Sequence, residues 1–181
     1  MDQYTCLLNK PVYDYSIKQH SLVKLNNYYN ICFISSFYNG LKLLYPNIIS
    51  LEEIITNIYP KTKLNLYTNF SQDFYKIWNK LKTLLEIFNY DTTNIVLSIW
   101  LPLKNNKCIN LVNIDMDKYD ENIIDSFLEE EFSSLKNKKI INVIQYNNHF
   151  DSIIIKNQTS EKYTDLHRLI DNFDIDHNFF N

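Results

Sequence analysis

The hydrophobic pattern of this chain changes once, from helical spacing to strand spacing, and that change constrains the fold more than any other feature. In residues 32–45 the apolar side chains recur every three or four positions, which predicts a helix with one buried face. Residues 72–89 carry the same pattern over a longer stretch and predict a long amphipathic helix. From residue 94 onward the chain turns to short runs rich in Ile, Val and Leu. The strand candidates are residues 94–103, 108–114, 140–146 and 149–155.

Local signals at the ends of these segments predict caps and turns. Asn30 stands where an N-cap is wanted for the first helix, and Pro46 ends that helix. Ser50 followed by Glu53 has the pattern of a capping box and predicts the start of another helix. The pair Asn147–Asn148 predicts a hairpin turn between the last two strands.

The remaining segments carry weaker signals. The stretch up to Asn30 is interpreted as irregular, apart from a short strand at Leu22–Leu25. The acidic residues 115–132 predict a loop with a short helix, and the polar tail from about residue 157 predicts a helix around Tyr163–Phe173. No repeat and no Pro-, Gly- or Ser-rich linker divides the chain, so we expect one domain over residues 1–181. Helices first and strands later favour an α+β or α/β class with an antiparallel hairpin near the end.

Composition excludes several classes of partner. The chain has 181 residues, 45% of them apolar, which is enough to bury a core without disulfides or metals. Its formal net charge is −3 and its single arginine is Arg168, so it lacks the basic footprint of a nucleic-acid-binding protein. No apolar run is long enough to cross a bilayer, and the first residues lack the pattern of a signal peptide. We therefore expect no nucleic-acid partner and no membrane insertion, and we expect a monomer.

The cysteines favour a reducing compartment. Cys6, Cys32 and Cys108 are odd in number and widely spaced, and no close Cys/His pair suggests a zinc site. We expect free thiols and a cytoplasmic location, which would be the host cytosol if the chain comes from a virus or an intracellular microbe. Cys108 falls within a predicted strand, and we interpret it and Cys6 as structural.

Cys32 is the strongest candidate for a nucleophile. It opens the predicted helix 32–45. The free N–H groups and the partial positive charge of a helix N-terminus favour the thiolate, which is the reactive form of cysteine. The same N–H groups can hold the oxyanion that forms when a carbonyl is attacked. The simpler interpretation of Cys32 is that of a small buried hydrophobic residue.

His149 and Asp151 form the second candidate group. Residues i and i+2 of a strand point to the same face, so the Asp151 carboxylate can lie beside the His149 imidazole. Such a carboxylate fixes the tautomer of the ring and stabilises its protonated form. The simpler interpretation is a polar strand end at a hairpin. Cys32 and the His149–Asp151 pair together are stronger evidence for a catalytic site than either alone, because the catalytic partners of a thiol hydrolase are far apart in the sequence and meet only in the fold.

Two segments resemble the ovarian-tumour (OTU) family of cysteine proteases. The segment NICFISSFYNGLK resembles the nucleophile helix of that family, with Cys32, Phe33, Ser36 and Phe37 at matching positions. The segment IINVIQYNNHFDSIII resembles its histidine strand, in which an aromatic residue and then Asp or Asn follow the histidine. These motifs cover about thirty residues. The loop before the cysteine departs from the family's Asp-Gly-Asn pattern, because Tyr29, Asn30 and Ile31 stand there.

The resemblance implies a papain-like, OTU-type fold whose central, mostly antiparallel sheet is packed between helices. It implies hydrolysis of isopeptide bonds at the C-terminus of ubiquitin or a ubiquitin-like protein, with no metal or organic cofactor. Cys32 would attack, His149 would transfer protons and Asp151 would orient His149. Backbone N–H groups of the loop at Tyr29, Asn30 and Ile31 would line the oxyanion hole.

Several assignments remain open at this point. The acidic residues Asp115, Asp117, Asp120 and Glu121 are candidates for docking the arginines of the ubiquitin tail, although such runs are usually solvated faces. Glu129–Glu131 is interpreted as an exposed helix face, and Trp78 and Trp100 as core residues. The other histidines, His20, His167 and His177, receive no role. Two alternatives to a deubiquitinase remain: another papain-like thiol hydrolase, and an inactive OTU-like module that binds ubiquitin or a host protein.

Overall fold

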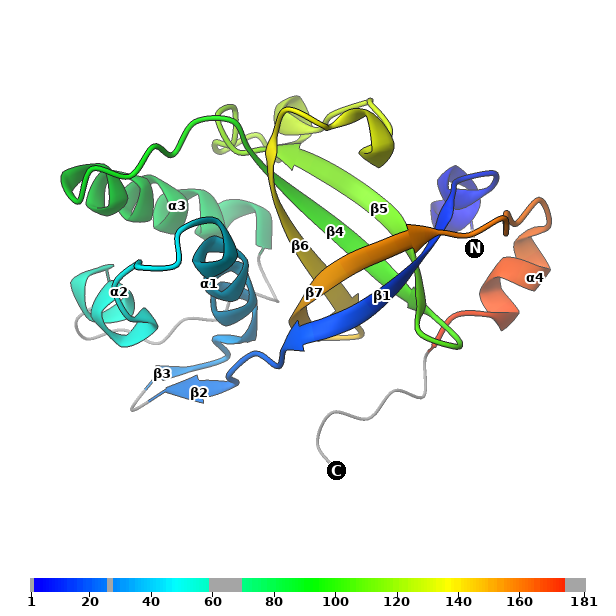
Figure 1. The fold of residues 1–181 in the computed structure, drawn as a ribbon, viewed down its shortest axis with the longest axis horizontal. Helices are drawn as coiled ribbons and strands as arrows, with labels where there is room; N and C mark the ends of the chain where they lie inside the picture. Colours follow the sequence, from blue (N-terminus) through cyan, green and yellow to red (C-terminus); the bar gives the residue numbers. More distant parts are fainter. Residues whose placement is uncertain (1, 26–27, 59–69, 175–181) are drawn as a thin grey trace.

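Five strands close into a barrel at the centre of the computed structural model, which describes residues 2–25, 28–58 and 70–174 (Figure 1). The strands are β1 (Val12–Gln19), β4 (Ile95–Leu103), β5 (Lys107–Asp115), β6 (Lys139–Tyr146) and β7 (His149–Gln158). They follow the order β1-β5-β4-β6-β7, and pairing of β1 with β7 closes the sheet. Strands β4 and β6 run parallel, whereas the other neighbouring pairs are antiparallel. The mixed sheet with helices confirms the predicted α+β class.

The strand β1 corrects one prediction. The stretch before Asn30 was expected to be irregular, yet Val12–Gln19 joins β5 on one side and β7 on the other. Its sequence, VYDYSIKQ, mixes charged and apolar residues without clean alternation, so its strand character depends on partners that are far along the chain. The short strand expected at Leu22–Leu25 is found in part, as β2 (Lys24–Leu25) paired with β3 (Tyr28–Tyr29).

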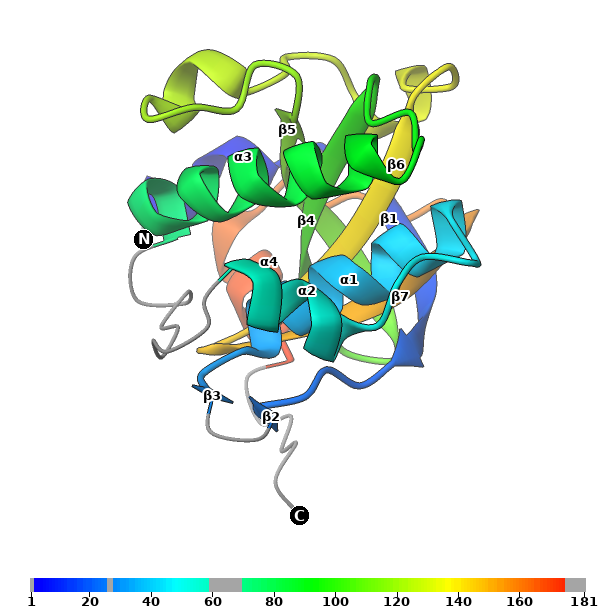
Figure 2. The same cartoon turned by 90° about the vertical axis from the view of Figure 1, so that its left-hand side faces the viewer.

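Three helices lie together on one side of the barrel, as Figures 1 and 2 show. They are α1 (Cys32–Leu44), α2 (Leu51–Ile58) and α3 (Phe70–Ile87), so the two long predicted helices are confirmed. On β4, the residues Ile95, Leu97 and Ile99 face this helical layer and share its core. Trp100 instead belongs to a separate cluster with side chains from every strand of the barrel, including Tyr13 and Tyr146. The alternation along β4 thus divides a helix-facing core from the barrel interior.

The single glycine of the chain, Gly40, lies where α1 approaches the sheet closely. A Cβ atom at this position would lie 2.5 Å from the Cγ2 atom of Ile141 on β6. Glycine costs about 1 kcal/mol relative to alanine in a helix interior. Its presence here is explained by the contact with the sheet, because α1 has no room for a side chain against Ile141.

Smaller elements cover the other side of the barrel and the β5–β6 connection. They are η1 (Asp2–Leu7), η2 (Ile123–Ser126), η3 (Phe132–Ser134) and α4 (Leu166–Asp171). The helix expected in the tail is therefore confirmed as α4, and a bridge between Leu103 and Phe173 fastens the chain after it to β4. The short helix expected in residues 115–132 is the 3-10 turn η2. Glu129–Glu131 is exposed but lies outside a helix, which corrects that assignment.

Asparagines take up positions that need a left-handed backbone. Asn30 has a φ of 58°, and the residue that caps α1 is Ile31, without a side-chain hydrogen bond. The predicted Asn30 cap is therefore wrong, because the left-handed conformation differs from that of an N-cap. Asn147, at φ 49°, makes the predicted turn between β6 and β7. The predicted cap of α2 is present, since the N–H of Glu53 donates to Ser50 Oγ at 3.2 Å.

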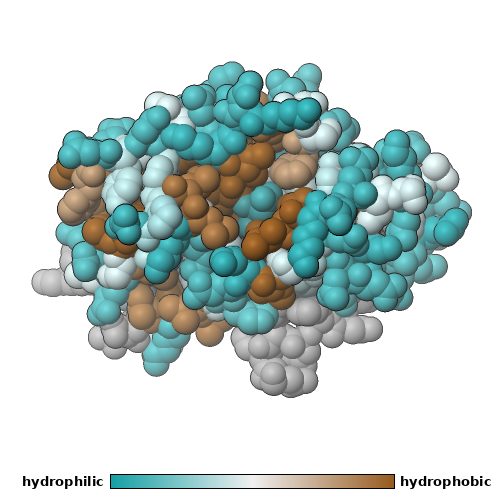
Figure 3. Space-filling model, viewed as in Figure 1, coloured by the Kyte–Doolittle hydropathy of each residue, from teal (hydrophilic) through white to brown (hydrophobic). Residues whose placement is uncertain are grey.

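The helices leave part of the sheet uncovered. Figure 3 shows hydrophobic side chains at the surface over β6 and β7, between the helical layer and β1. On β7, Ile154 has 40% of its surface exposed. Within the described part of the chain, no helix has both the length and the apolar character needed to cross a membrane.

Candidate active site

Cys32 is the first residue of α1, as the sequence predicted. Its side chain is buried, with 2% of its surface exposed, and its sulfur lies 3.9 Å from the carbonyl oxygen of Asn148. Asn148 belongs to the turn between β6 and β7, so the start of the helix and the start of β7 meet at this point. Phe33 and Phe150, the residues after Cys32 and His149, pack edge to face with ring centroids 5.0 Å apart. This contact fixes the two backbones relative to each other.

His149 and Asp151 lie on the same face of β7. The Nε2 atom of His149 is 3.1 Å from Oδ1 of Asp151, and both side chains are buried. Burial lowers the pKa of His149, but hydrogen bonds to Asp151 and to Cys32, together with their charges, outweigh burial and raise it to about 9. Because Asp151 binds Nε2, the Nδ1 atom is the ring nitrogen left for the Cys32 thiol. The structure thus brings all three predicted residues together.

The segment after β1 completes this group, and the sequence analysis missed it. The backbone N–H of Ser21 donates to Oδ1 of Asp151 at 2.7 Å, and Nδ1 of His20 lies 3.0 Å from Oδ2. The hydroxyl of Ser21 donates to the carbonyl of Phe150 and lies 3.5 Å from Nε2 of His149. His20 received no role because no partner pattern surrounds it in the sequence. Only the pairing of β1 with β7 brings it to Asp151.

The hydrogen bonds around Asp151 favour its charged form. Burial raises the pKa of this carboxyl, but hydrogen bonds from His149, Ser21 and His20, with the charge of His149, lower it below its ordinary value. Asp151 is therefore an anion at neutral pH that holds a protonated His149. A protonated imidazole beside a sulfur stabilises the thiolate form of cysteine.

The loop before Cys32 has its own hydrogen-bond pattern. The N–H of Asn30 donates to the carbonyl of Val23 at 3.0 Å, so this donor is already used between the loop and the β2 segment. Tyr29 lies in β3 with 42% of its surface exposed, whereas Ile31 is fully buried. The first N–H groups of a helix lack partners within the helix. The backbone N–H of Cys32 is therefore the donor next to its sulfur that suits an oxyanion.

The acidic candidates are not part of this group. Asp115 ends β5 and the other three follow it, at the upper end of the barrel in Figures 1 and 2, whereas β7 begins at the lower end. Two of their carboxylates hold nearby backbone: Asp115 accepts from the N–H of Asp117 at 3.0 Å, and Asp117 accepts from the N–H of Asn94 at 3.0 Å. Asp120 likewise accepts from the N–H of Asn122 at 2.8 Å. Glu121 lies in the same loop. These contacts give most of the acidic run a role in shaping the loop after β5.

The remaining candidates lie elsewhere. Trp78 and Trp100 are buried core residues, as predicted. Cys108 is buried in β5 and burial raises the pKa of its thiol, while Cys6 is exposed on η1. His167 lies in α4, and His177 falls outside the described residues. In the part of the chain that the structure describes, no cluster of three His, Cys, Asp or Glu side chains is arranged to hold a metal ion.

No protein-family model, curated protein or solved structure matches this chain. The geometry of Cys32, His149 and Asp151 is therefore the evidence on which a function can be argued.

Proposed function

We propose that this protein is a cysteine hydrolase that cleaves isopeptide bonds at the C-terminus of ubiquitin or a ubiquitin-like modifier. The observation that carries the proposal is the meeting of three side chains: Cys32 at a helix N-terminus, His149 bonded to it, and Asp151 at 3.1 Å from His149. Nucleophile, base and orienting carboxylate in this order form the arrangement of thiol hydrolases. The resemblance of both motifs to OTU proteases supports the substrate class.

The chemistry follows from the protonation states. The Cys32 thiolate attacks the carbonyl carbon of the scissile bond, and the negative charge that moves to the carbonyl oxygen is held by the N–H of Cys32. The C–N bond then breaks as protonated His149 gives its proton to the leaving amine, which leaves a thioester on Cys32. A water molecule loses a proton to His149 and attacks the thioester. The C–S bond breaks, the carboxylic acid departs, and the Cys32 thiolate is restored beside protonated His149.

Exposed apolar side chains next to this group support a protein substrate. Leu22 and Val23 follow Ser21 directly and are 46% and 45% exposed, and Tyr29 on β3 is 42% exposed. Apolar surface gathered beside a catalytic group is typical of contacts with another protein rather than with a small polar molecule.

The Asn30 loop favours a second candidate, an inactive module that binds the modifier. An oxyanion hole built with the N–H of Asn30 would require the loop to release its bond to Val23. In the proposed enzyme, the N–H of Cys32 holds the oxyanion without help from the N–H of Asn30. Reactivity of Cys32 separates the two candidates.

The test is reaction with ubiquitin that carries an electrophile at its C-terminus, read by intact mass. Wild type is expected to gain one adduct, and Cys32→Ala none. Cys6→Ser is the matched control, because Cys6 is an exposed thiol on η1 and has no part in the group around Cys32, and it should label like wild type. A folded wild type that fails to label beside a working control enzyme, while still binding ubiquitin, would favour the inactive module. If wild type neither reacts with the ubiquitin electrophile nor binds ubiquitin, but a simple alkylating agent labels Cys32 selectively, another thiol hydrolase is favoured.

A further inference from the structure

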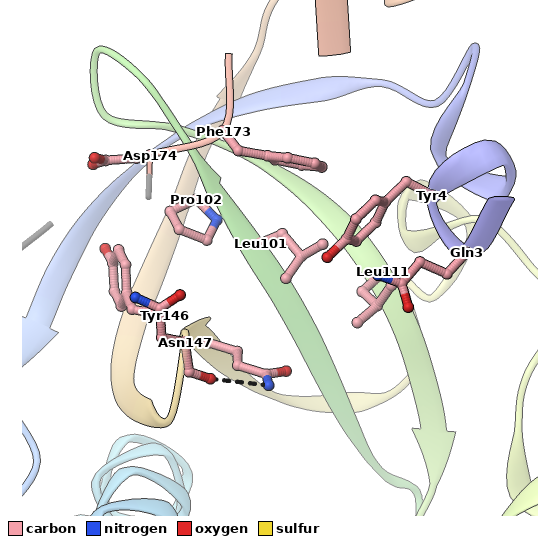
Figure 4. Close-up of a pocket in the computed structure, with 10 residues that line it drawn as sticks. Gln3, Tyr4, Leu101, Pro102, Leu111, Tyr146, Asn147, Phe173 and Asp174 are labelled. Atoms are coloured by element: carbon pink, nitrogen blue, oxygen red, sulfur yellow. Dashed lines mark hydrogen bonds between the residues drawn. The ribbon is translucent and has the colours of Figure 1, made fainter. Parts of the chain in front are cut away.

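A pocket of about 340 Å³ lies beside the β6–β7 turn, which directly precedes His149. Its floor is formed by Leu101 of β4 and Leu111 of β5, and its walls by Tyr4 of η1 and Phe173 after α4 (Figure 4). Asn147, the first residue of the β6–β7 turn, closes it on the side of that turn. Its volume is in the range of sites that hold small molecules or single side chains.

The walls of this pocket are held in place by the fold. The rings of Tyr4 and Phe173 pack against each other with centroids 5.0 Å apart. Phe173 forms a bridge with Leu103, and the backbone N–H of Asp174 donates to the carbonyl of Pro102 at 3.1 Å. The chain after α4 is thus fastened to β4, so the pocket is formed before any ligand arrives.

The lining defines the chemistry of the occupant. Aromatic and aliphatic side chains make up the floor and much of the walls, and the amide side chains of Gln3, Gln145 and Asn147 complete the lining. Among the described residues that line the pocket, Asp174 is the one charged side chain. A pocket with an apolar floor, aromatic walls and one carboxylate suits an aliphatic stem that ends in a positive charge, since the stem packs on the rings and the charge approaches the carboxylate. Lysine and arginine side chains have this form.

The position of the pocket indicates which part of a substrate would reach it. His149 must give its proton to the leaving amine, so the leaving group lies on the His149 side of the Cys32 sulfur. The turn at Asn147 and Asn148 stands on that side, with the carbonyl of Asn148 3.9 Å from the sulfur. A chain that leaves along this turn passes Asn147, which also lines the pocket.

We propose that the pocket binds a lysine or arginine side chain on the leaving-group side of the scissile bond, with its charge beside Asp174. This rests on the proposed function, because it takes the substrate to be a modified lysine in a protein. The pocket would make the enzyme prefer modified lysines that have a basic neighbour.

The test uses ubiquitin joined through its C-terminus to the lysine side chain of a short peptide, with either Arg or Glu next to that lysine. A third substrate carries a coumarin amide in place of the peptide and has no residue to fill the pocket. Wild type is expected to cleave the Arg peptide with a kcat/KM about three- to fivefold above that for the Glu peptide, as for one solvent-accessible ion pair. The ratio of the two values within one variant is the readout, so a partial loss of folded protein cancels.

Three variants complete the test. Asp174→Asn should bring the ratio close to one, and Asp174→Lys should invert it in favour of the Glu peptide. Asp171→Asn is the matched control, because Asp171 is an exposed acidic residue at the end of α4 outside the pocket lining, and it should keep the wild-type ratio. A ratio of one in wild type, or a wild-type ratio that persists in both Asp174 variants, would overturn the pocket proposal. If the coumarin substrate is still cleaved, the proposed function stands in that case. A wild type that cleaves none of the three substrates would overturn the proposed function, and this proposal with it.

Discussion

The Nδ1 atom of His20 lies 3.0 Å from Oδ2 of Asp151, the oxygen opposite to the one that binds His149. Asp151 thus stands between two imidazoles, and the N–H of Ser21 donates to it as well at 2.7 Å. A carboxylate held on both oxygens has little freedom to rotate. In the proposed enzyme Asp151 orients His149, so we expect His20 to act on the reaction as a positioning residue.

Replacing His20 by alanine should lower kcat and leave KM unchanged, because the ring of His149 is less well held while the substrate surface is intact. Two-thirds of the His20 side chain is exposed, at 67%. The expected loss is therefore only about three- to tenfold, as for a charge-assisted hydrogen bond that solvent screens. Steady-state kinetics with the coumarin substrate measure it.

Two further variants separate positioning from stability. His20→Asn places an amide N–H near the position of Nδ1 and should restore most of kcat. His167→Ala removes an exposed histidine on α4 and should leave kcat unchanged. Equal loss in His20→Asn and His20→Ala, or a loss that follows the melting temperature of each variant, would contradict a positioning role.

The pH dependence of activity should report His149. Its pKa is raised to about 9, so the proton needed by the leaving amine is present at neutral pH and is lost above this value. In wild type we expect kcat/KM to decline along an alkaline limb near pH 9. Asp151→Asn removes one cause of the raised pKa, so the limb should move to lower pH. The variant should also lose about 10²- to 10⁴-fold in activity, as carboxylate-to-amide changes do in such triads. An unchanged limb in Asp151→Asn would mean that another group sets it.

The same shift makes the free energy of unfolding depend on pH. In the unfolded chain the pKa of His149 has its ordinary value of about 6.5. Between about pH 6.5 and 9 the folded state therefore binds more protons than the unfolded state. The contribution of His149 is fully present below pH 6.5 and is lost as the pH rises through 9. It amounts to on the order of 3 kcal/mol. Urea unfolding of wild type and His149→Gln at pH 6, 7.5 and 9.5 measures it, and the two proteins should differ in the slope of stability against pH. Parallel slopes would show that His149 does not gain a proton on folding.

The elements with a strong local pattern could be predicted from the sequence. Helices α1 and α3 have apolar residues at helical spacing, and the β6–β7 hairpin has Asn147–Asn148 at its turn, so Cys32 and His149 were placed correctly at the starts of a helix and a strand. Their meeting could be expected only from the resemblance to OTU proteases. No short-range sequence pattern predicts that α1 and β7, which are far apart along the chain, pack together.

The rest of the site depends on long-range pairing. β1 lacks a clean alternation and is a strand because β5 and β7 flank it. His20 and Ser21 reach Asp151 through that pairing, so a search for motifs passes over them. The acidic run at the end of β5 shows the opposite error. Asp115 and Asp117 have a clear charge pattern, but Asp115 binds backbone in its own loop and Asp117 binds the backbone N–H of Asn94, just before β4.

Gly40 offers a test of how closely α1 must approach the sheet for the site to form. Gly40→Ala adds a methyl group 2.5 Å from Cγ2 of Ile141, a buried β-branched side chain that cannot turn away. Alanine gains about 1 kcal/mol of helix propensity, but overpacking in a core costs about 1–3 kcal/mol, so we expect a net loss of stability. The double variant Gly40→Ala with Ile141→Val keeps the branched carbon and should recover little. Gly40→Ala with Ile141→Ala makes room and should be more stable than the sum of the two single changes predicts. Because Cys32 is on the same helix, Gly40→Ala should also lower the rate of labelling by the ubiquitin electrophile. A Gly40→Ala protein that is more stable than wild type would show that α1 has room to move away from β6.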